Sequence, residues 1–331
     1  MSDGPIAPFC AAPLHVVGRF DDPFTGAERS LPDLAQALRG RRETLLWSDV
    51  EPHPTFAEQG VRQIGVTAGS FPQGGMLLVG GVHVHLGPWL ERAGMQRIAL
   101  RYNLPNHLRL FDTIARIRAA TDAEPELIFV SRALQVAVGM RGRIEPSLIR
   151  LDPYLKLPLQ RSAARALTIG RLSRDVIEKH DPRDAAVYRM LAARGVQVRI
   201  MGGTCLRPWL KDVAGIELLP VGAEDVVRFL GSLDVFFYRT GSFSEPYGRV
   251  VLEAMASGLP VVVAANGGYM EQIRPGLDGF PVDGQEEALQ VLTRLAQSEA
   301  LRLQIGAAAR SRSIDVHGDA AIDRMLEHYL V

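Results

Sequence analysis

A strand–loop–helix–strand pattern between residues 234 and 264 constrains the fold more than any other feature of this sequence. Residues 234–238 form a short apolar run rich in aromatic side chains, which is typical of a buried strand. A helix is predicted over residues 247–256, with Gly258 as its stop. Residues 259–264 are a continuous apolar run, as in a central parallel strand. This order makes one half of a doubly wound α/β domain, which binds ligands at the carboxyl ends of its strands.

The same alternation of strands and helices recurs along all 331 residues, a length that suits two domains. A hydrophobic content of 47% indicates that both domains can form a core. We predict a first domain over residues 1–150, a linker over 151–162, and a second domain over 163–315. A final helix over residues 316–331 is expected to pack back on the first domain. In the first domain, the helix over 106–120 carries an apolar side made of Leu108, Phe111, Ile114, Ala115 and Ile117.

Two carboxylates, Glu245 and Glu253, frame the start of the predicted helix at 247–256. Carboxylates accept hydrogen bonds from hydroxyl groups, so one could hold a sugar and the other a ribose diol. Backbone N–H groups at the start of the helix could bind the phosphates between them. The alternative interpretation is structural, with Glu245 capping the helix and Glu253 facing solvent.

The sequence from 245 onward resembles the retaining glycosyltransferases of family four, also called group 1. That family has two glutamates separated by seven residues, with an aromatic residue and glycine after the first one. Its motif ends in Glu-Ala-Met-Ala-x-Gly-x-Pro-Val. The residues that match are Glu245, Tyr247, Gly248, Glu253, Ala254, Met255, Ala256, Gly258, Pro260 and Val261, followed by Gly267, Gly268, Glu271, Gly276 and Gly279.

The resemblance implies a GT-B fold, in which two Rossmann-like domains face a central cleft. It also implies a nucleotide-diphosphate sugar as donor substrate, bound mainly by the second domain, and an acceptor hydroxyl bound by the first. In this family the acceptor attacks from the leaving diphosphate's own face, so Glu245 would position the sugar and Glu253 the ribose. The nucleotide-sugar site implied for this chain comprises Gly26, Gly170, Arg171, Lys179, Val221, Tyr247, Gly248, Arg249, Val250 and Glu253.

The cations expected at the diphosphate are Arg171 and Lys179, which follow the first strand of the second domain. One arginine and one lysine there would neutralise the departing phosphates. The family has its lysine about three residues nearer to the arginine, so Arg174 competes with Lys179 for this role. Ordinary surface charges after a strand are the alternative for Arg171 and Lys179.

Two further candidates lie in the first domain. Gly26 matches part of a glycine-rich turn where the family's backbone approaches the donor, although a simple loop glycine is the alternative. His83 and His85 follow the strand at 76–79 and would share one face if the strand continued. We favour His85 as the histidine that faces the donor sugar and expect it to be catalytic together with Glu245, Arg171 and Lys179. A structural histidine, or a metal site lacking a clear third ligand, remains an alternative.

Neither a metal nor another cofactor is expected. The chain has no Asp-x-Asp motif of the kind that holds a metal on a sugar nucleotide, which favours metal-independent transfer. It also has no Gly-x-Gly-x-x-Gly after the first strand of either domain, which argues against a nicotinamide-dependent dehydrogenase.

Charge and cysteine content limit the partners and the compartment. The formal net charge is zero, so no global field recruits nucleic acid. The two cysteines, Cys10 and Cys205, are far apart and fit a reducing compartment. Residues 1–13 lack the pattern of a signal peptide, so a cytoplasmic enzyme is expected. Arginines concentrate between residues 92 and 118. They could meet the inner membrane face or a lipid-linked acceptor, or form a solvated face.

We therefore predict a glycosyltransferase that acts on a carbohydrate or lipid-linked acceptor in polysaccharide, glycolipid or glycoconjugate biosynthesis. The competing hypothesis is a catalytically silent nucleotide-sugar-binding protein, which the shortness of the first domain favours.

Overall fold

A computed structural model of the chain describes residues 10–160 and 165–331, and side chains from residue 12 onward. The first nine residues of the segment considered for a signal peptide, and residues 161–162 of the predicted linker, lie outside the described residues. The described chain divides into two compact units. Unit 1 is Met1–Leu148 with Asp319–Val331, and unit 2 is Ile149–Gly318.

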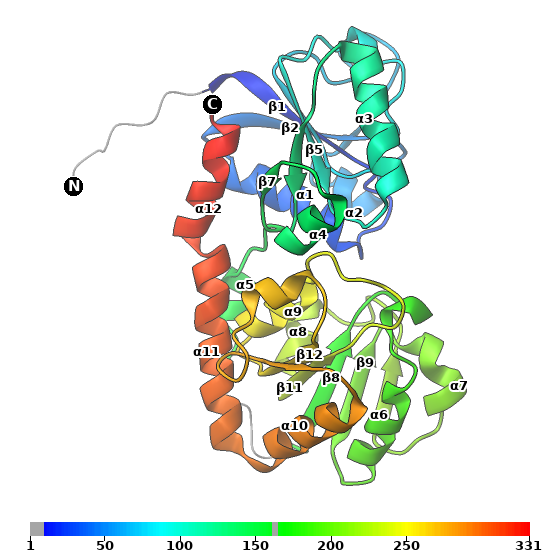
Figure 1. Ribbon diagram of the computed structural model, residues 1–331, viewed down its shortest axis with the longest axis vertical. Helices are drawn as coiled ribbons and strands as arrows, with labels where there is room; N and C mark the ends of the chain where they lie inside the picture. Colours follow the sequence, from blue (N-terminus) through cyan, green and yellow to red (C-terminus); the bar gives the residue numbers. More distant parts are fainter. Residues whose placement is uncertain (1–9, 161–164) are drawn as a thin grey trace, which may run out of the picture. The chain divides into compact units, whose positions relative to one another are not determined.

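Unit 1 is built on a parallel sheet that has seven strands within the described residues, in the order β3-β2-β1-β4-β5-β6-β7 (Figure 1). Its strands are β1 (Cys10–Gly18), β2 (Arg42–Ser48), β3 (Arg62–Gln63), β4 (Met76–Val79), β5 (Arg97–Tyr102), β6 (Glu126–Phe129) and β7 (Arg143–Ile144). Its helices are α1 (Gly26–Ala37), α2 (Pro54–Ala57), η1 (Leu90–Arg92), α3 (His107–Thr121), α4 (Arg132–Val138), α12 (Asp319–Leu326) and η5 (Glu327–Tyr329). Every residue of β4 is buried, as expected of a central parallel strand.

Unit 2 repeats this plan with a parallel sheet of six strands in its described residues, in the order β10-β9-β8-β11-β12-β13. Its strands are β8 (Thr168–Leu172), β9 (Gln197–Met201), β10 (Ile216–Leu219), β11 (Val235–Tyr238), β12 (Val261–Ala264) and β13 (Phe280–Val282). Its helices are α5 (Asp152–Leu155), η2 (Ile177–Lys179), α6 (Asp184–Ala192), η3 (Thr204–Leu206), α7 (Arg207–Leu210), α8 (Val226–Gly231), α9 (Arg249–Ala256), η4 (Gly268–Gln272), α10 (Gln285–Gln297) and α11 (Glu299–His317).

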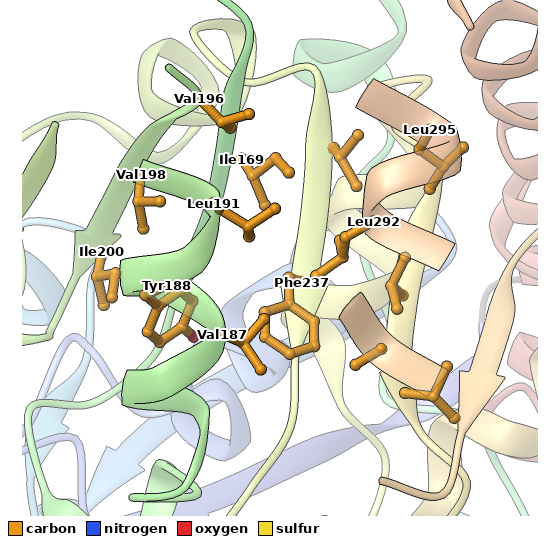
Figure 2. Close-up of a cluster of buried hydrophobic side chains, with 14 of the residues drawn as sticks. Ile169, Val187, Tyr188, Leu191, Val196, Val198, Ile200, Phe237, Leu292 and Leu295 are labelled. Carbon is orange, nitrogen blue, oxygen red and sulfur yellow. The ribbon is translucent and has the colours of Figure 1, made fainter. Parts of the chain in front are cut away.

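The core of unit 2 lies between its sheet and the helices α6 and α10 (Figure 2). Ile169 on β8 and Phe237 on β11 are fully buried, and Phe237 meets Tyr188 of α6 edge to face with ring centroids 5.7 Å apart. Leu292 of α10 covers the same face. Burying each such side chain stabilises the fold by about 1.5–3 kcal/mol, so this face of the sheet holds its strands in register.

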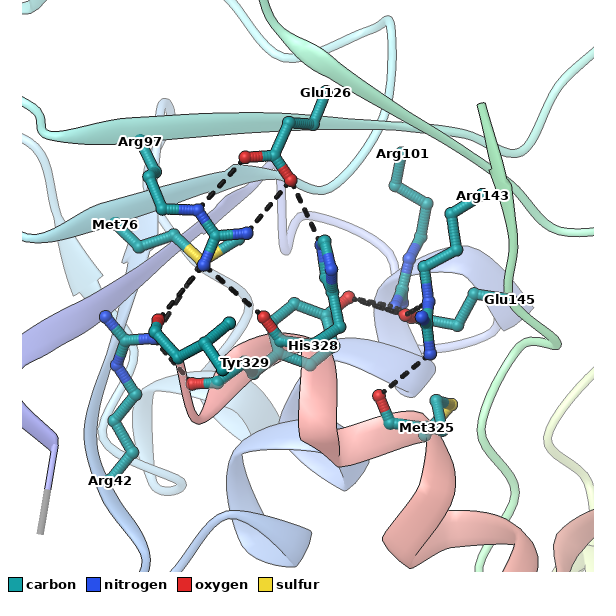
Figure 3. Close-up of polar contacts among 11 residues, drawn as sticks. Arg42, Met76, Arg97, Arg101, Glu126, Arg143, Glu145, Met325, His328 and Tyr329 are labelled. Carbon is teal, nitrogen blue, oxygen red and sulfur yellow. Dashed lines mark hydrogen bonds and ion pairs between the residues drawn. The ribbon is translucent and has the colours of Figure 1, made fainter. Parts of the chain in front are cut away.

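The C-terminal segment Asp319–Val331 is held in unit 1 by polar contacts with residues from the first part of that unit (Figure 3). Tyr329 donates to both carboxylate oxygens of Glu145 at 2.8 and 3.0 Å, and Arg101 forms an ion pair with the same carboxylate. Arg42 donates to the Tyr329 carbonyl at 2.5 Å. All three side chains of the Arg101–Glu145–Tyr329 group are buried. The charge of the Glu145 carboxylate is therefore compensated by Arg101 and by the hydrogen bonds from the Tyr329 hydroxyl, rather than by water.

The unit boundaries differ from the predicted ones by a few residues. The predicted linker at 151–162 begins with the short helix α5, which belongs to unit 2 and buries Tyr154. The prediction missed this helix because its four residues are too few to display a helical period. At the other end, α11 continues to His317 rather than stopping before 316, so the passage into unit 1 falls at Gly318.

The predicted apolar side of the helix at 106–120 was partly wrong. Residues Leu110, Ile114 and Ile117 face the core of unit 1, whereas Leu108 and Phe111 are 84% and 52% exposed. None of the helices in the described part of the chain combines the length and the apolar character that a membrane crossing requires.

Candidate functional site

The candidate site lies at the carboxyl ends of β8 and β11, which are neighbours in the sheet of unit 2. Gly170 is inside β8 and pairs with Phe236 of β11. A Cβ atom at Gly170 would lie 2.5 Å from the Arg199 carbonyl and 2.6 Å from Leu233. This glycine therefore permits close packing within unit 2. The family resemblance had instead implied that Gly170 lies at the nucleotide sugar.

The centre of the site is a hydrogen-bonded group of Lys179, Glu245 and Tyr238. The Nζ atom of Lys179 donates to Oε2 of Glu245 at 2.7 Å, and the Tyr238 hydroxyl donates to the same oxygen at 2.7 Å. The side chains of Lys179 and Glu245 are only 9% and 12% exposed. Burial lowers the pKa of Lys179, and the Glu245 carboxylate opposes that shift. The group offers one lysine cation and one carboxylate at the edge of the sheet where parallel-sheet domains bind ligands.

Phe243 packs against this lysine. The Lys179 Nζ atom is 3.5 Å from the centroid of the Phe243 ring, and the Arg174 guanidinium carbon is 5.8 Å from it. The Phe243 amide donates to the Glu178 carbonyl at 3.1 Å, which joins the loop after β8 to the loop after β11. The structure therefore brings Lys179, rather than Arg174, to Glu245, with the additional residues before Lys179 taken up by this loop.

Arg171 lies beneath the group and has no exposed surface. Its guanidinium donates to the Arg239 carbonyl at 2.7 Å and to the Lys179 carbonyl at 2.6 Å, and its carbon is 4.7 Å from the Tyr238 ring centroid. Sequence reasoning expected this arginine to face the diphosphate. In the structure it holds the backbone of Lys179 in place and contributes a buried positive charge below the site.

Two buried aspartates hold the side chain of Arg239, the residue whose carbonyl accepts a hydrogen bond from Arg171. The Arg239 guanidinium donates to Asp181 at 3.0 Å and forms a shorter bond to Asp184. Burial raises the pKa of Asp184 to about 7, against the opposing effect of Arg239. Each of these three side chains is at least 95% buried, so the network is a rigid floor under the site.

The helix α9 begins at Arg249, two residues later than predicted. Gly248 adopts φ 81°, which is unsuited to a helical residue, and a Cβ atom there would lie 2.5 Å from the Tyr269 ring. Glu253 is fully buried one turn into α9, and its carboxylate lies 3.6 Å from the Arg249 guanidinium. The alternative of a solvent-facing Glu253 is thus wrong.

The remaining predicted residues of unit 2 differ in position. Tyr247 is buried beside the start of α9, and Val250 is half-buried in its first turn. Val221 follows the edge strand β10, which is separated from β8 by β9. The segment opens with a turn in which the Ala223 amide donates to the Pro220 carbonyl at 3.3 Å.

In unit 1, Gly26 is the first residue of α1, and the loop of residues 19–25 joins it to the carboxyl end of β1. Nearby, burial and the neighbouring Asp21 raise the pKa of Glu28 to about 7, while the amide of Asp22 donates to this carboxylate at 3.3 Å. Glu28 was not singled out from the sequence, because a glutamate in the first turn of a helix is a common capping feature.

His83 and His85 lie in the loop that follows β4, so the expectation that a strand places them on one face is wrong. The backbone turns after Val79. His85 is exposed and its amide donates to Asp49 at 2.5 Å, whereas His83 is half-buried. Burial and the nearby Arg109 lower the pKa of His83. Among the residues with described positions, no three His, Cys, Asp or Glu side chains form a group able to hold a metal ion.

Sequence reasoning missed Tyr238 and Phe243. Both were visible as aromatic residues at and after the end of a predicted strand, but that pattern alone does not distinguish a core aromatic from one that contacts a site. Their role becomes apparent only when the loop carrying Lys179 is placed against them.

Comparison with known proteins identifies the family of this region. Residues 217–312 match the family described as glycosyl transferases group 1. The D-inositol 3-phosphate glycosyltransferase of Salinispora arenicola is 35% identical over 121 residues, covering 33% of this chain and 27% of that protein. The protein of the same name from Thermobifida fusca is 29% identical over 200 residues, covering 54% of this chain and 45% of that protein. The chain thus matches less than half the length of these relatives.

Solved structures resemble the chain over most of its length. Anabaena HepE, in complex with UDP and glucose, has a TM-score of 0.70 at 18% identity, covering 96% of this chain and 98% of that one. A glycosyltransferase from Rickettsia africae has a TM-score of 0.69 at 14% identity, with 96% and 97% covered. At this identity the likeness establishes the fold, and the predicted GT-B fold is confirmed.

Proposed function

We propose that the chain is a group 1 glycosyltransferase and that it moves a sugar from a nucleotide-diphosphate sugar to an acceptor hydroxyl. The observation that carries this proposal is the Lys179–Glu245–Tyr238 group at the carboxyl ends of β8 and β11. A cation beside a carboxylate, next to the start of α9, suits a ligand that has both phosphates and hydroxyls. The solved complexes of HepE with UDP and with UDP-glucose support a donor of this class.

In the proposed reaction the acceptor oxygen forms a bond to the anomeric carbon while the bond to the diphosphate oxygen breaks, and the proton of the acceptor hydroxyl passes to the departing diphosphate. Lys179 would stabilise the negative charge that grows on the leaving diphosphate, because its ammonium is already held in a dry site. Glu245 would accept hydrogen bonds from sugar hydroxyls, and Glu253 from the ribose. We propose that transfer retains the configuration of the donor, with the acceptor entering on the face that the diphosphate leaves.

We also propose that transfer is independent of metal ions. Two cations, Lys179 and Arg171, lie at or below the group, with the N–H groups of α9 beside it. These supply the charge that a divalent ion would otherwise bring to the diphosphate. Full activity after dialysis against EDTA is expected, and activity that disappears with EDTA and returns with magnesium or manganese would contradict the proposal.

For the acceptor we propose a carbohydrate or a lipid-linked molecule presented at an anionic membrane surface. The support is the outer face of α3, where Leu108, Phe111, Ala115 and Ala119 are all exposed at spacings of three and four residues. Arg109, Arg116 and Arg118 flank this stripe, and Asp112 is paired with Arg116 at 3.0 Å. A helix with an apolar stripe and basic flanks is typical of one that lies in a membrane interface.

The decisive experiment uses the whole chain with a panel of labelled nucleotide sugars. Release of nucleoside diphosphate, by hydrolysis or by transfer to an added acceptor, is expected with at least one donor. Thermal shift with the corresponding nucleoside diphosphates identifies the base first, because a tight ligand stabilises the protein by mass action. A protein that binds a nucleotide sugar but never cleaves it would instead be the silent binding protein of the competing hypothesis.

A further inference from the structure

Tyr247 and His317 form a buried hydrogen bond that no part of the proposed reaction uses. The Tyr247 oxygen is 2.7 Å from Nε2 of His317, and the two rings meet edge to face at 5.9 Å. Both residues are at least 96% buried. Burial and the nearby Arg249 lower the pKa of His317 to about 3, so the imidazole is neutral and its tautomer sets which of the two groups donates the hydrogen bond. The bond is therefore a neutral one between two distant parts of unit 2.

Tyr247 lies in the loop that carries Glu245 and leads into α9. It stands between Glu245 of the proposed sugar site and Gly248, which precedes α9. The backbone of this loop is held on one side by residues 267–269. The Gly268 amide donates to the Glu245 carbonyl at 2.8 Å, and a Cβ atom at Gly268 would lie 1.8 Å from the Pro246 carbonyl. On the other side, the loop is held by the hydrogen bond between the Tyr247 hydroxyl and His317.

His317 is the last residue of α11, and Gly318, where unit 2 ends, follows it directly. The same helix holds the far end of α9, because Arg310 donates to the carbonyls of Ala256 and Ser257 at 3.1 and 3.0 Å. These are carbonyls at the C-terminus of α9, which have no partner within that helix. Helix α11 thus contacts α9 at its end through Arg310 and the loop before its start through His317.

We propose that His317 is a positioning residue for transfer: it fixes Tyr247, and through that residue the Glu245 carboxylate and the first turn of α9. This inference rests on the proposed function. Because α11 leads directly into the segment that joins the two units, the bond ties the sugar-binding loop to that segment. The charged groups that face the pair are Arg249 of α9, Glu271 of η4 and Arg312 of α11.

The test compares Tyr247→Phe and His317→Leu, each of which removes one partner, with His317→Gln, which keeps an acceptor. Each of the first two is expected to lower kcat about threefold to tenfold, the equivalent of one lost neutral hydrogen bond. The Kd of the nucleoside diphosphate, which has no sugar for Glu245 to hold, should stay within about twofold. His317→Gln should recover most of kcat because its amide can accept a hydrogen bond from the tyrosine hydroxyl or donate one to it.

Two controls separate positioning from stability. Ser313→Ala removes a buried hydroxyl from α11 that donates to the Arg310 carbonyl at 2.7 Å, and it should leave kcat unchanged. In the double variant Tyr247→Phe with His317→Leu, the loss of kcat should equal that of a single variant, because both changes break the same bond. Losses that multiply, or variants that melt earlier yet keep kcat, would overturn the proposal.

A readout that does not depend on transfer keeps the two proposals distinguishable. Hydrogen exchange of the ligand-free protein over residues 245–256 should rise in Tyr247→Phe and in His317→Leu, with no rise over residues 197–219. If the wild-type protein cleaves no donor, the proposed function fails, and exchange alone decides the positioning role. Unchanged exchange over 245–256 would overturn it in either case.

Discussion

The Nζ atom of Lys179 lies 2.7 Å from Oε2 of Glu245, although 66 residues separate the two in the sequence. One residue follows the first strand of unit 2 and the other follows its fourth, and these strands are neighbours in the sheet. The strand order, rather than the sequence spacing, thus places the cation and the carboxylate together. The first prediction tests this pair.

Replacing Lys179 by methionine is expected to lower kcat by about a hundredfold, the scale of losing one preorganised donor at a developing charge. Lys211→Met is the matched control, because Lys211 is 70% exposed and its ammonium lies 4.0 Å from the exposed carboxylate of Asp212. Steady-state kinetics at saturating donor measure the effect. A Lys179→Met enzyme at the wild-type rate would exclude the lysine from the reaction.

Arg171→Ala is expected to destabilise unit 2 as well as to slow the enzyme. The change leaves the buried carbonyls of Lys179 and Arg239 without their donors, at a cost of about 1–3 kcal/mol each. Urea unfolding measures the loss. Arg174→Ala, at an arginine that packs on the face of Phe243, should cost less than about 1 kcal/mol. Equal losses for the two variants would show that the two carbonyl bonds of Arg171 carry no stability.

Glu253→Gln tests the ribose. The substitution keeps the shape of a fully buried side chain but removes its charge, and the nucleoside diphosphate is expected to bind about ten- to a hundredfold more weakly. Calorimetry should also show that the wild type prefers the ribonucleotide to its 2′-deoxy form and that the variant does not. Glu286→Gln, at an exposed position of α10, is the matched control. A variant that keeps the preference would contradict the assignment.

The stability of unit 2 should fall below about pH 6.5 because of His180. Its Nε2 lies 2.8 Å from the Gly202 carbonyl, and burial together with Arg171 lowers its pKa to about 3. Between pH 6.5 and about pH 3, His180 is protonated in the unfolded chain but stays neutral in the folded protein. The contribution is therefore complete above pH 6.5 and is lost as the pH falls, by up to about 1.4 kcal/mol per pH unit. His180→Asn should flatten the pH dependence of the unfolding free energy by this slope, and an unchanged slope would contradict the prediction.

The proposed membrane contact predicts that the protein binds vesicles containing anionic lipids and that Leu108→Ser with Phe111→Ser weakens binding at least about tenfold. Val136→Ser, at a 71% exposed position of α4, is the control for loss of an exposed apolar side chain. Raising the salt concentration should weaken wild-type binding, because dissolved ions screen the attraction between the arginines and the anionic lipids. Equal binding by the double variant would exclude the α3 stripe.

The fold was largely predictable because its strands are short apolar runs. The strand at 76–79 was predicted with the bounds that the structure has, the GT-B fold is confirmed, and residues 217–312 match the group 1 family. The strands β7 and β13 were missed, since two or three residues display no period. The site was less predictable. Sequence motifs identified Lys179 and Glu245 but not the burial of Arg171, which depends on the carbonyls that the folded loops bring to it.

The return of the chain to unit 1 at Asp319 has a consequence for its synthesis on the ribosome. Unit 2 is one continuous stretch and can fold as soon as it has emerged. Unit 1 cannot, because the buried Arg101–Glu145 pair needs the hydroxyl of Tyr329, and Leu326 fills part of its core. For the time needed to translate about 180 further residues, at about 5–20 residues per second, a nascent unit 1 exposes an unfilled apolar surface. This half of the protein is the part that we expect a chaperone to hold.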